Sequence, residues 1–457
     1  MTQCWLAPWQ RGAKKARALR TILHLEGLEE RNLLTQGLVV VPNPAGVGQN
    51  MFGAAAVAAN DIWGVGSNEF IDPTTGAIDV QPLAEHFDGK SWSAVSTPAV
   101  PSGGVNPPNA QLRGVAAAAS NDVWAVGSRT GPDNPDFGES LTEHWNGSGW
   151  SVVSTPTATV ESTILDGVAA VSPRNVWAVG SNSGKALIEH WDGTSWSIVS
   201  NPVIASAGGV LAVSADSAND VWAVGGETIL HFDGTNWSQV ASPNLSATSV
   251  TALSPTNAWA VGTVGAFINH HSFRQAAIEH WDGTSWSIVA SPNPNPKGPS
   301  TLNGIAAISA NDMWAVGSIG VSQTITEHWD GTSWSIVHSP NPAQNQNELF
   351  GVTALSDGTV AAVGHQEDVN TDQPLILQNA ASAPKKATTA AAPETTMAGP
   401  WDVAPVLPAE TTTATPSRLM PAALDAAATD QFFAAVAWAA RPWSFADHHA
   451  EAHQAAE

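Results

Sequence analysis

Glutamate and histidine recur together along this chain and are the residues with the most evident chemical capacity. The repeated histidines are His86, His144, His190, His231, His280 and His328, and a glutamate precedes five of the six. A carboxylate beside an imidazole can perform acid–base catalysis or bind a metal. Consecutive residues of a β-strand face opposite sides, however, so Glu189 and His190 cannot converge from one strand. We therefore interpret these pairs as hydrogen-bonding groups of a repeated core.

One segment that does not repeat, 263–275, combines several kinds of binding group. It carries Phe267, His270, His271, Phe273 and Arg274. Aromatic surface together with a cation is typical of the anchors of a binding interface. Neighbouring histidines usually point apart, so we predict partner-binding residues here and no metal site. An ordinary solvated loop is the alternative.

Acidic residues gather in two other irregular segments. In 128–140 we take Asp133, Asp136 and Phe137 as candidate partner-binding residues. Glu139 follows them. The second segment, 365–373, contains Glu367, Asp368 and Asp372. Such oxygen ligands suit Ca²⁺, but the ligand spacing of a calcium-binding loop is absent. We expect no cofactor, with Ca²⁺ as the alternative.

Composition excludes several chemistries. The only cysteine is Cys4, so neither an intramolecular disulfide nor a cysteine metal cluster can form. Tyrosine is absent, which removes the tyrosyl radical of copper oxidases and the tyrosine nucleophile of sialidases. Phosphate-binding glycine loops, zinc-ligand spacings and the nucleophile elbow are also missing. We identify no catalytic residue.

The elements that position these residues are seven repeats. Variants of "NDVWAVGS" are centred on Trp63, Trp124, Trp177, Trp222, Trp259 and Trp314, and "GTVAAVG" places Ala361 in a seventh copy. "EHWDGTSWSIV" or a variant follows each of the first six. The period is typical of a four-stranded propeller blade. In one unit, 302–309, 312–318, 324–330 and 333–339 are predicted strands A, B, C and D. Asp-Gly or Asn-Gly between C and D predicts a tight turn.

The seventh repeat stops before strand D, and segment 38–44, "LVVVPNP", has the character of the missing strand. We predict that Leu38–Val41 pairs beside Leu375–Gln378 and closes the ring, which protects the sheet edges. The predicted fold is thus an all-β, seven-bladed propeller over 38–379. Segment 1–37 is an export or sorting segment, 380–417 an Ala/Pro/Thr-rich disordered linker, and 418–457 a tail with a short helix.

The two ends of the ring differ in their connections. A–B and C–D turns are short and uniform, whereas B–C and D–A connections vary in length. The most distinctive segments are 67–81, 128–140, 263–275 and 365–373. Loops on a rigid scaffold commonly carry function, so we expect partners at the B–C and D–A end.

Charge limits the class of partner. The net charge is −23, and 29 of the 40 acidic residues but only seven of the 17 basic ones lie in 38–379. Such a field repels phosphate, which argues against nucleic acid and anionic membranes. The chain also has no apolar run long enough for a membrane-spanning helix. We expect a monomer that binds a protein or a glycan.

Three family resemblances add to these inferences. The repeat over 38–379 resembles kelch-like and galactose-oxidase-like propellers, which implies the architecture and no activity. "WDGTSW" is loosely similar to the Asp-box of sialidase-type propellers. Segment 25–34, "LEGLEERNLL", resembles the LEPR-XLL motif of large bacterial surface proteins and implies export; an amphipathic helix is the alternative.

These observations favour a non-enzymatic, secreted or cell-surface module of a bacterial envelope. The alternative is a hydrolase or lyase with an Asp/Glu/His site at the mouth of the channel. An intracellular kelch-like adaptor is a third interpretation.

Overall fold

The computed structural model describes residues 37–44, 46, 48–71, 76–99, 109–130, 138–156, 162–268, 271–368 and 371–379. In this part the chain forms seven antiparallel sheets of four strands each. The predicted all-β, seven-bladed propeller is confirmed. The linker and the tail helix expected in 380–457 lie outside the described residues, and so does the export segment expected in 1–37, apart from Gly37.

Blades 1 to 3 follow the chain in order. Blade 1 consists of β2 (Gln49–Ala58), β3 (Asp61–Ile71), β4 (Ile78–Phe87) and β5 (Trp92–Ala94). Blade 2 consists of β6 (Ala110–Ala119), β7 (Asp122–Thr130), β8 (Gly138–Trp145) and β9 (Trp150–Val152). Blade 3 consists of β10 (Thr163–Ser172), β11 (Asn175–Asn182), β12 (Lys185–Trp191) and β13 (Trp196–Ile198), and the short helix α2 (Pro202–Ser206) follows it.

Blades 4 to 7 repeat the pattern. Blade 4 consists of β14 (Ala212–Ser217), β15 (Asp220–Gly225), β16 (Thr228–Phe232) and β17 (Trp237–Gln239). Blade 5 consists of β18 (Ser246–Ser254), β19 (Asn257–Ile268), β20 (His271–Trp281) and β21 (Trp286–Val289). Blade 6 consists of β22 (Ser300–Ser309), β23 (Asp312–Ile319), β24 (Gln323–Trp329) and β25 (Trp334–Ile336). Blade 7 consists of β26 (Gln346–Ala354), β27 (Val360–Asp368), β28 (Thr371–Asn379) and β1 (Leu38–Val40).

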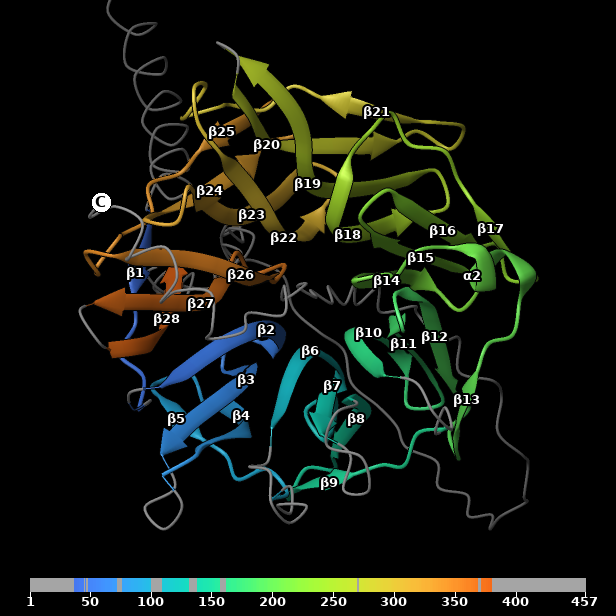
Figure 1. Cartoon of the computed structure of the whole chain (residues 1–457), viewed down its shortest axis with the longest axis vertical. Helices are drawn as coiled ribbons and strands as arrows, with labels where there is room; N and C mark the ends of the chain where they lie inside the picture. The colour runs from blue at the N-terminus through green and yellow to red at the C-terminus, as the bar shows by residue number, and fades with distance from the viewer. Residues whose placement is uncertain are drawn as a thin grey trace, which may run out of the picture. The chain divides into compact units, whose positions relative to one another are not determined.

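The innermost strands form a closed ring around one axis (Figure 1). Each innermost strand contacts that of the next blade, and β26 contacts β2. Glycine permits the close approach: a Cβ on Gly114 would lie 2.9 Å from the carbonyl oxygen of Asp166 in the next blade. The small residues of strand A are therefore required where neighbouring backbones meet.

The ring is closed by the first described strand. β1 pairs antiparallel with β28 in the register Leu38↔Asn379, Val39↔Gln378 and Val40↔Leu377. The backbone N–H of Val41 also donates to the carbonyl of Ile376 at 2.9 Å. The predicted pairing is confirmed, and it buries Leu38 in the core of blade 7.

Tryptophans pack the blades against each other. Trp124 of blade 2 contacts Trp191 and Trp196 of blade 3, with ring centroids 4.9 and 5.3 Å apart. The same contacts join Trp63 to Trp145 and Trp150 of blade 2. These large rings fill the space between adjacent sheets, which explains the repeated motif.

The C–D turn differs in detail from the two-residue hairpin that Asp-Gly predicts. Four residues connect each C strand to its D strand in the first six blades. In blade 3, Asp192 Oδ1 accepts hydrogen bonds from the backbone N–H groups of Thr194 and Ser195. Gly193 follows with φ of 96°, where a side chain would be strained. The aspartate thus closes a wider turn with its own carboxylate.

The two ends of the ring are unequal, as predicted. Every A–B turn of blades 1 to 6 has two residues, whereas D–A connections range from six to fifteen. We call the end formed by the A–B and C–D turns the short-turn face. The end formed by the B–C and D–A connections is the long-connection face.

Candidate functional site

The repeated histidines belong to the blade core. In each case His Nε2 lies within hydrogen-bonding distance of the residue that begins strand B. The partners are Asp61, Asp122, Asn175, Asp220, Asn257 and Asp312, at 2.5 to 3.0 Å. In blade 2, Asp122 Oδ1 also accepts from Trp124 Nε1 at 3.1 Å, and Trp124 stacks on His144. This contact joins strands B and C of one blade.

The glutamates that precede these histidines face the opposite side of each blade. Glu85, Glu143, Glu189, Glu279 and Glu327 are all buried. Burial raises the pKa of Glu85 to about 7 and that of Glu143 to about 8. The carboxylate of Glu279 instead accepts from Ser242 Oγ of the preceding blade, at 3.0 and 2.8 Å. This contact ties the D–A connection of blade 4 to blade 5.

Polar side chains also meet beside the ring axis. Arg113 and Asp166 occupy equivalent bulge positions of β6 and β10 and form a buried ion pair at 2.6 Å. Burial raises the pKa of Asp166, and Arg113 opposes that shift. Phe52 and Phe350 fill the same positions in blades 1 and 7, with centroids 5.8 Å apart. Bulged residues of strand A therefore line the axis.

A second carboxyl near the axis belongs to blade 7. Glu348 Oε1 accepts from Asn303 Nδ2 at 3.2 Å and from Ser318 Oγ at 3.1 Å. Burial raises the pKa of Glu348, and these hydrogen bonds oppose the shift. Glu348 is the cross-strand partner of His365, whose Nε2 lies 3.2 Å from Gln346 Oε1. The acidic groups at the axis thus have partners from the protein itself.

The long-connection face carries exposed apolar side chains on protruding hairpins. Segment 263–275, expected to be a loop, is a continuation of β19 and β20 with only two residues between the strands. Segment 365–373 is likewise mostly strand, because β27 and β28 remain paired out to Asp368 and Thr371. Continued pairing satisfies the backbone groups that an irregular loop would leave to water.

The predicted binding residues of segment 263–275 are divided between the two sides of its hairpin. Phe267 is 72% exposed and lies on the same side as Arg274, since Phe267 pairs with Ser272 and Arg274 with Gly265. Phe273 is half-buried and lies on the other side. Arg274 Nη1 donates to Ser246 Oγ at 2.9 Å, which holds the guanidinium against blade 5.

Of the other predicted binding residues, only His271 lies in the described part of the chain. His271 begins β20, and the structure describes only its backbone. His270, Asp133, Asp136 and Phe137 lie outside the described residues. Among the residues that are described, no group of three His, Cys, Asp or Glu side chains is arranged to hold a metal. In the predicted acidic segment 128–140, residues 131–137 lie outside the described part, so its binding role and the alternative of a Ca²⁺ site stay predictions.

Sequence reasoning missed other exposed groups on this face. Phe70, Ile71 and Ile78 are exposed at the end of the blade 1 hairpin, and Val321 is exposed in the B–C turn of blade 6. For blade 1 the sequence contained a usable indication, because the B–C segment 67–81 was predicted to be distinctive. The prediction did not include the apolar residues with which strands β3 and β4 extend beyond the blade.

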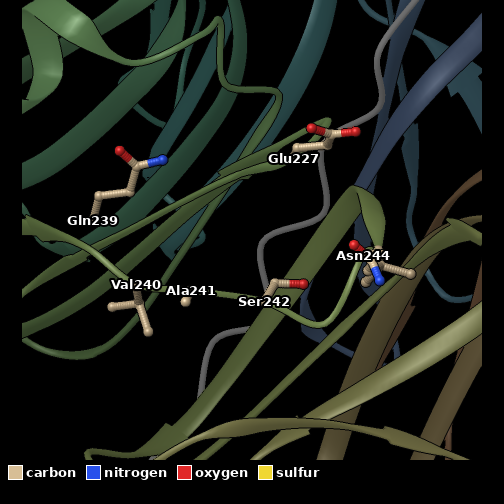
Figure 2. A pocket seen from close by; sticks show the side chains of 7 residues that line it. Glu227, Gln239, Val240, Ala241, Ser242 and Asn244 are labelled. Carbon is tan, nitrogen blue, oxygen red and sulfur yellow. The ribbon is translucent and has the colours of Figure 1, made fainter.

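A depression of about 400 Å³ lies on the same face between blades 4 and 5. It forms where blade 4 has the shortest strands B and C and a two-residue B–C turn. Figure 2 shows Glu227 and Ser242 on facing sides of the space, with Asn244 beside them. Asn244 has φ of 95°, so the D–A connection turns sharply there. The lining is mixed, with amide, hydroxyl, carboxylate and aliphatic groups.

In the described part of the chain, no helix has the length and apolar character needed to cross a membrane.

Neither a protein-family model nor a curated protein matches the sequence. Solved structures are similar in fold. YCF48 bound to D1 peptide shares 12% identity and a TM-score of 0.50, over 76% of this chain and 96% of that one. The extracellular domain of a putative hybrid two-component system, BT4673 from B. thetaiotaomicron, shares 11% identity and a TM-score of 0.47, over 76% and 40%. At 12% identity, the similarity to YCF48 shows the propeller fold alone.

Proposed function

We propose that this chain is a non-enzymatic binding module that is exported to the cell surface and recognises a protein partner through the long-connection face. The observation that carries the proposal is the concentration there of exposed Phe267, Ile71 and Val321 on a face whose opposite end is uniform. Exposed aromatic and aliphatic side chains on a rigid scaffold are typical interface anchors.

The position of the first and last residues of the propeller supports this choice of face. Leu38 and Asn379 are paired, and both lie at the short-turn end of blade 7. Segments attached to them therefore join the propeller on the side away from the long-connection face. A propeller tethered through either segment would leave that face open to a partner.

The carboxyl groups beside the ring axis favour a binding function over hydrolase or lyase activity. An Asp/Glu/His catalytic site at the channel mouth would use carboxyls that are available to a substrate. Asp166 is instead paired with Arg113, and Glu348 is held by Asn303 and Ser318. The similar fold of YCF48, a protein whose structure contains a bound peptide, adds a precedent for peptide recognition on such a ring.

The test is affinity capture from the native cells with the full chain and two variants. Phe267→Ser removes an exposed anchor of the long-connection face. Ile198→Ser is the matched control, because Ile198 is exposed on the outer strand of blade 3. We expect Phe267→Ser to reduce capture of the specific partner about tenfold while Ile198→Ser leaves it unchanged.

Equal capture by all three proteins would reject this face as the binding site. A glycan array probed with the same three proteins tests whether the ligand is a carbohydrate. Specific glycan binding that depends on Phe267 would replace the protein partner with a carbohydrate. Fractionation of the same cells checks the surface location, and recovery only from the cytosol would overturn it.

A further inference from the structure

Blades 7 and 1 place several carboxylates on the long-connection face with no lysine or arginine beside them in the sequence. The sequence contains no lysine or arginine in 37–89 or in 339–379, the two segments that build these blades up to Lys90. Glu69, Glu367, Asp368 and Asp372 nevertheless lie on the long-connection face there. Lys90 lies in the C–D turn of blade 1, on the short-turn face. The seam between blades 7 and 1 on the long-connection face therefore presents a negative potential that no lysine or arginine of these two blades balances.

Backbone hydrogen bonds fix the two hairpins of this seam. The N–H of Gly48 donates to the carbonyl of Asp372 at 2.8 Å, and the N–H of Glu69 donates to the carbonyl of Gly48 at 2.6 Å. One residue thus links the hairpin of blade 7 to that of blade 1. Glu69 and Asp372 are consequently held close together, and burial together with the Asp372 charge raises the pKa of Glu69. The Asp372 charge also acts on His365, but burial lowers the pKa of that imidazole and so favours its neutral form.

Exposed aliphatic surface adjoins these carboxyls. Ile71 pairs with Ile78, so both side chains lie on one side of the blade 1 hairpin. Glu69, two residues from Ile71, faces the same side. Ile71 is 70% exposed, and Ile78 is also exposed. The hairpin therefore has an apolar tip, formed by Ile71 and Ile78, and an acidic residue, Glu69, nearer the blade.

We propose that the seam between blades 7 and 1 on the long-connection face docks a protein segment that is both basic and apolar. A lysine or arginine of the partner lies between Glu69 and Asp372, and its apolar residues cover Ile71 and Ile78. The inference rests on the proposed function and adds the class of partner and the place on the face. Complementary charge chiefly sets specificity and association rate, while the apolar contact supplies affinity.

The chain's own leader contains Lys14, Lys15, Arg17 and Arg20 and is a competing occupant. It joins the propeller at Leu38, on the short-turn side of the ring, so we assign the seam to a separate protein. A divalent cation is the other competitor. The described residues contain no triad of acidic or histidine side chains arranged for a metal, which argues against it.

The test uses the full-length protein and a fluorescent synthetic peptide in which lysine and leucine alternate. Two further peptides replace lysine by glutamate or leucine by serine. The account predicts saturable binding of the first peptide only. Glu69→Gln with Asp372→Asn should weaken it about tenfold, and Ile71→Ser with Ile78→Ser by a similar factor. Binding should also weaken from low to high salt.

Matched variants outside the seam provide the control. Glu227→Gln removes an exposed carboxylate at blade 4, and Ile336→Ser removes an exposed aliphatic group on the outer strand of blade 6. Both should bind the peptide like the parent protein. Thermal unfolding distinguishes docking from folding: Glu69→Gln relieves repulsion and should not lower the melting temperature, although it weakens binding.

Three results would overturn the proposal. The first is peptide affinity that is equal in the seam variants and the parent. The second is a response to Ca²⁺ alone that requires Glu69 and Asp372 while the peptide does not bind. The third is a large gain in peptide affinity when Lys14, Lys15, Arg17 and Arg20 are changed to glutamine, which would identify the leader as the occupant. Capture that depends on Phe267 without peptide binding would reject only the seam and leave the proposed function standing.

Discussion

Leu38 pairs with Asn379 at the position where tryptophan pairs with tryptophan in blade 6. There Trp334 lies opposite Trp329, and both are indoles of the repeated motif. Leu38 is only 2% exposed and packs with Leu377 in the core of blade 7. The ring is thus closed by a small aliphatic contact together with a three-residue ladder.

Truncation of Leu38 tests that closure. Leu38→Ala removes buried volume that the fixed β28 cannot easily fill, so we expect a loss of about 2–5 kcal/mol in unfolding free energy. Val39→Ala is the control, because Val39 is 48% exposed on the same strand and should change stability by less than about 0.5 kcal/mol. Urea unfolding of both variants gives the comparison. Equal losses would mean that β1 does not contribute its core contact in solution.

Asp122, whose carboxylate accepts from both His144 and Trp124, provides a second test. Asn175 and Asn257 occupy the position of Asp122 in other blades and accept the same histidine contact. Asp122→Asn should therefore cost little, whereas Asp122→Ala removes the acceptor of buried Trp124 and half-buried His144 and should cost about 1–3 kcal/mol. Chemical denaturation separates the two. A loss as large for asparagine as for alanine would show that the negative charge, and not the acceptor oxygen, is required.

The Arg113–Asp166 ion pair predicts a non-additive response. Arg113→Met leaves the Asp166 carboxylate buried without its partner and should cost about 3–5 kcal/mol. Arg113→Met combined with Asp166→Leu removes both charges and should recover most of that loss. Thermal unfolding of the single and double variants measures the coupling. Additive losses would contradict a pairing role for these residues.

The buried glutamates make stability depend on pH. Burial raises the pKa of Glu143, Glu189 and Glu327 to about 8, against 4.5 when exposed. The folded state then binds more protons than the unfolded state between these values. Unfolding free energy should fall as pH rises through that interval, by up to about 1.4 kcal/mol per pH unit for each group.

Glutamine substitution checks the assignment of this pH effect. Glu143→Gln should remove one group's share of the decline, and Glu227→Gln at an exposed position should leave the slope unchanged. Urea midpoints from pH 5 to about pH 8.5 provide the measurement. A slope that is the same in all three proteins would show that Glu143 is ionised normally in the fold.

The sequence was sufficient for the fold because its signal is repeated. Seven copies of strand B and a displaced strand D predicted the blade number and the pairing of Leu38 beside blade 7. Turn geometry was less predictable, since Asp192 closes a four-residue turn through side-chain contacts that the Asp-Gly pattern does not distinguish from a tighter hairpin.

The binding face was harder to predict in detail. Unequal connection lengths indicated the correct asymmetry, but whether Phe267 and Phe273 share a side depends on strand register, which local composition does not set. The meeting of Glu69 with Asp372, and of Arg113 with Asp166, depends on ring closure and on bulges. Those contacts join residues from different blades and leave no local pattern.

Hydrogen exchange of the full protein with and without its captured partner tests the central claim most directly. The account predicts new protection in the B–C hairpins, including 263–268 and 67–71, while the A–B and C–D turns exchange as before. Protection confined to those turns or to the outer D strands would contradict recognition through the long-connection face.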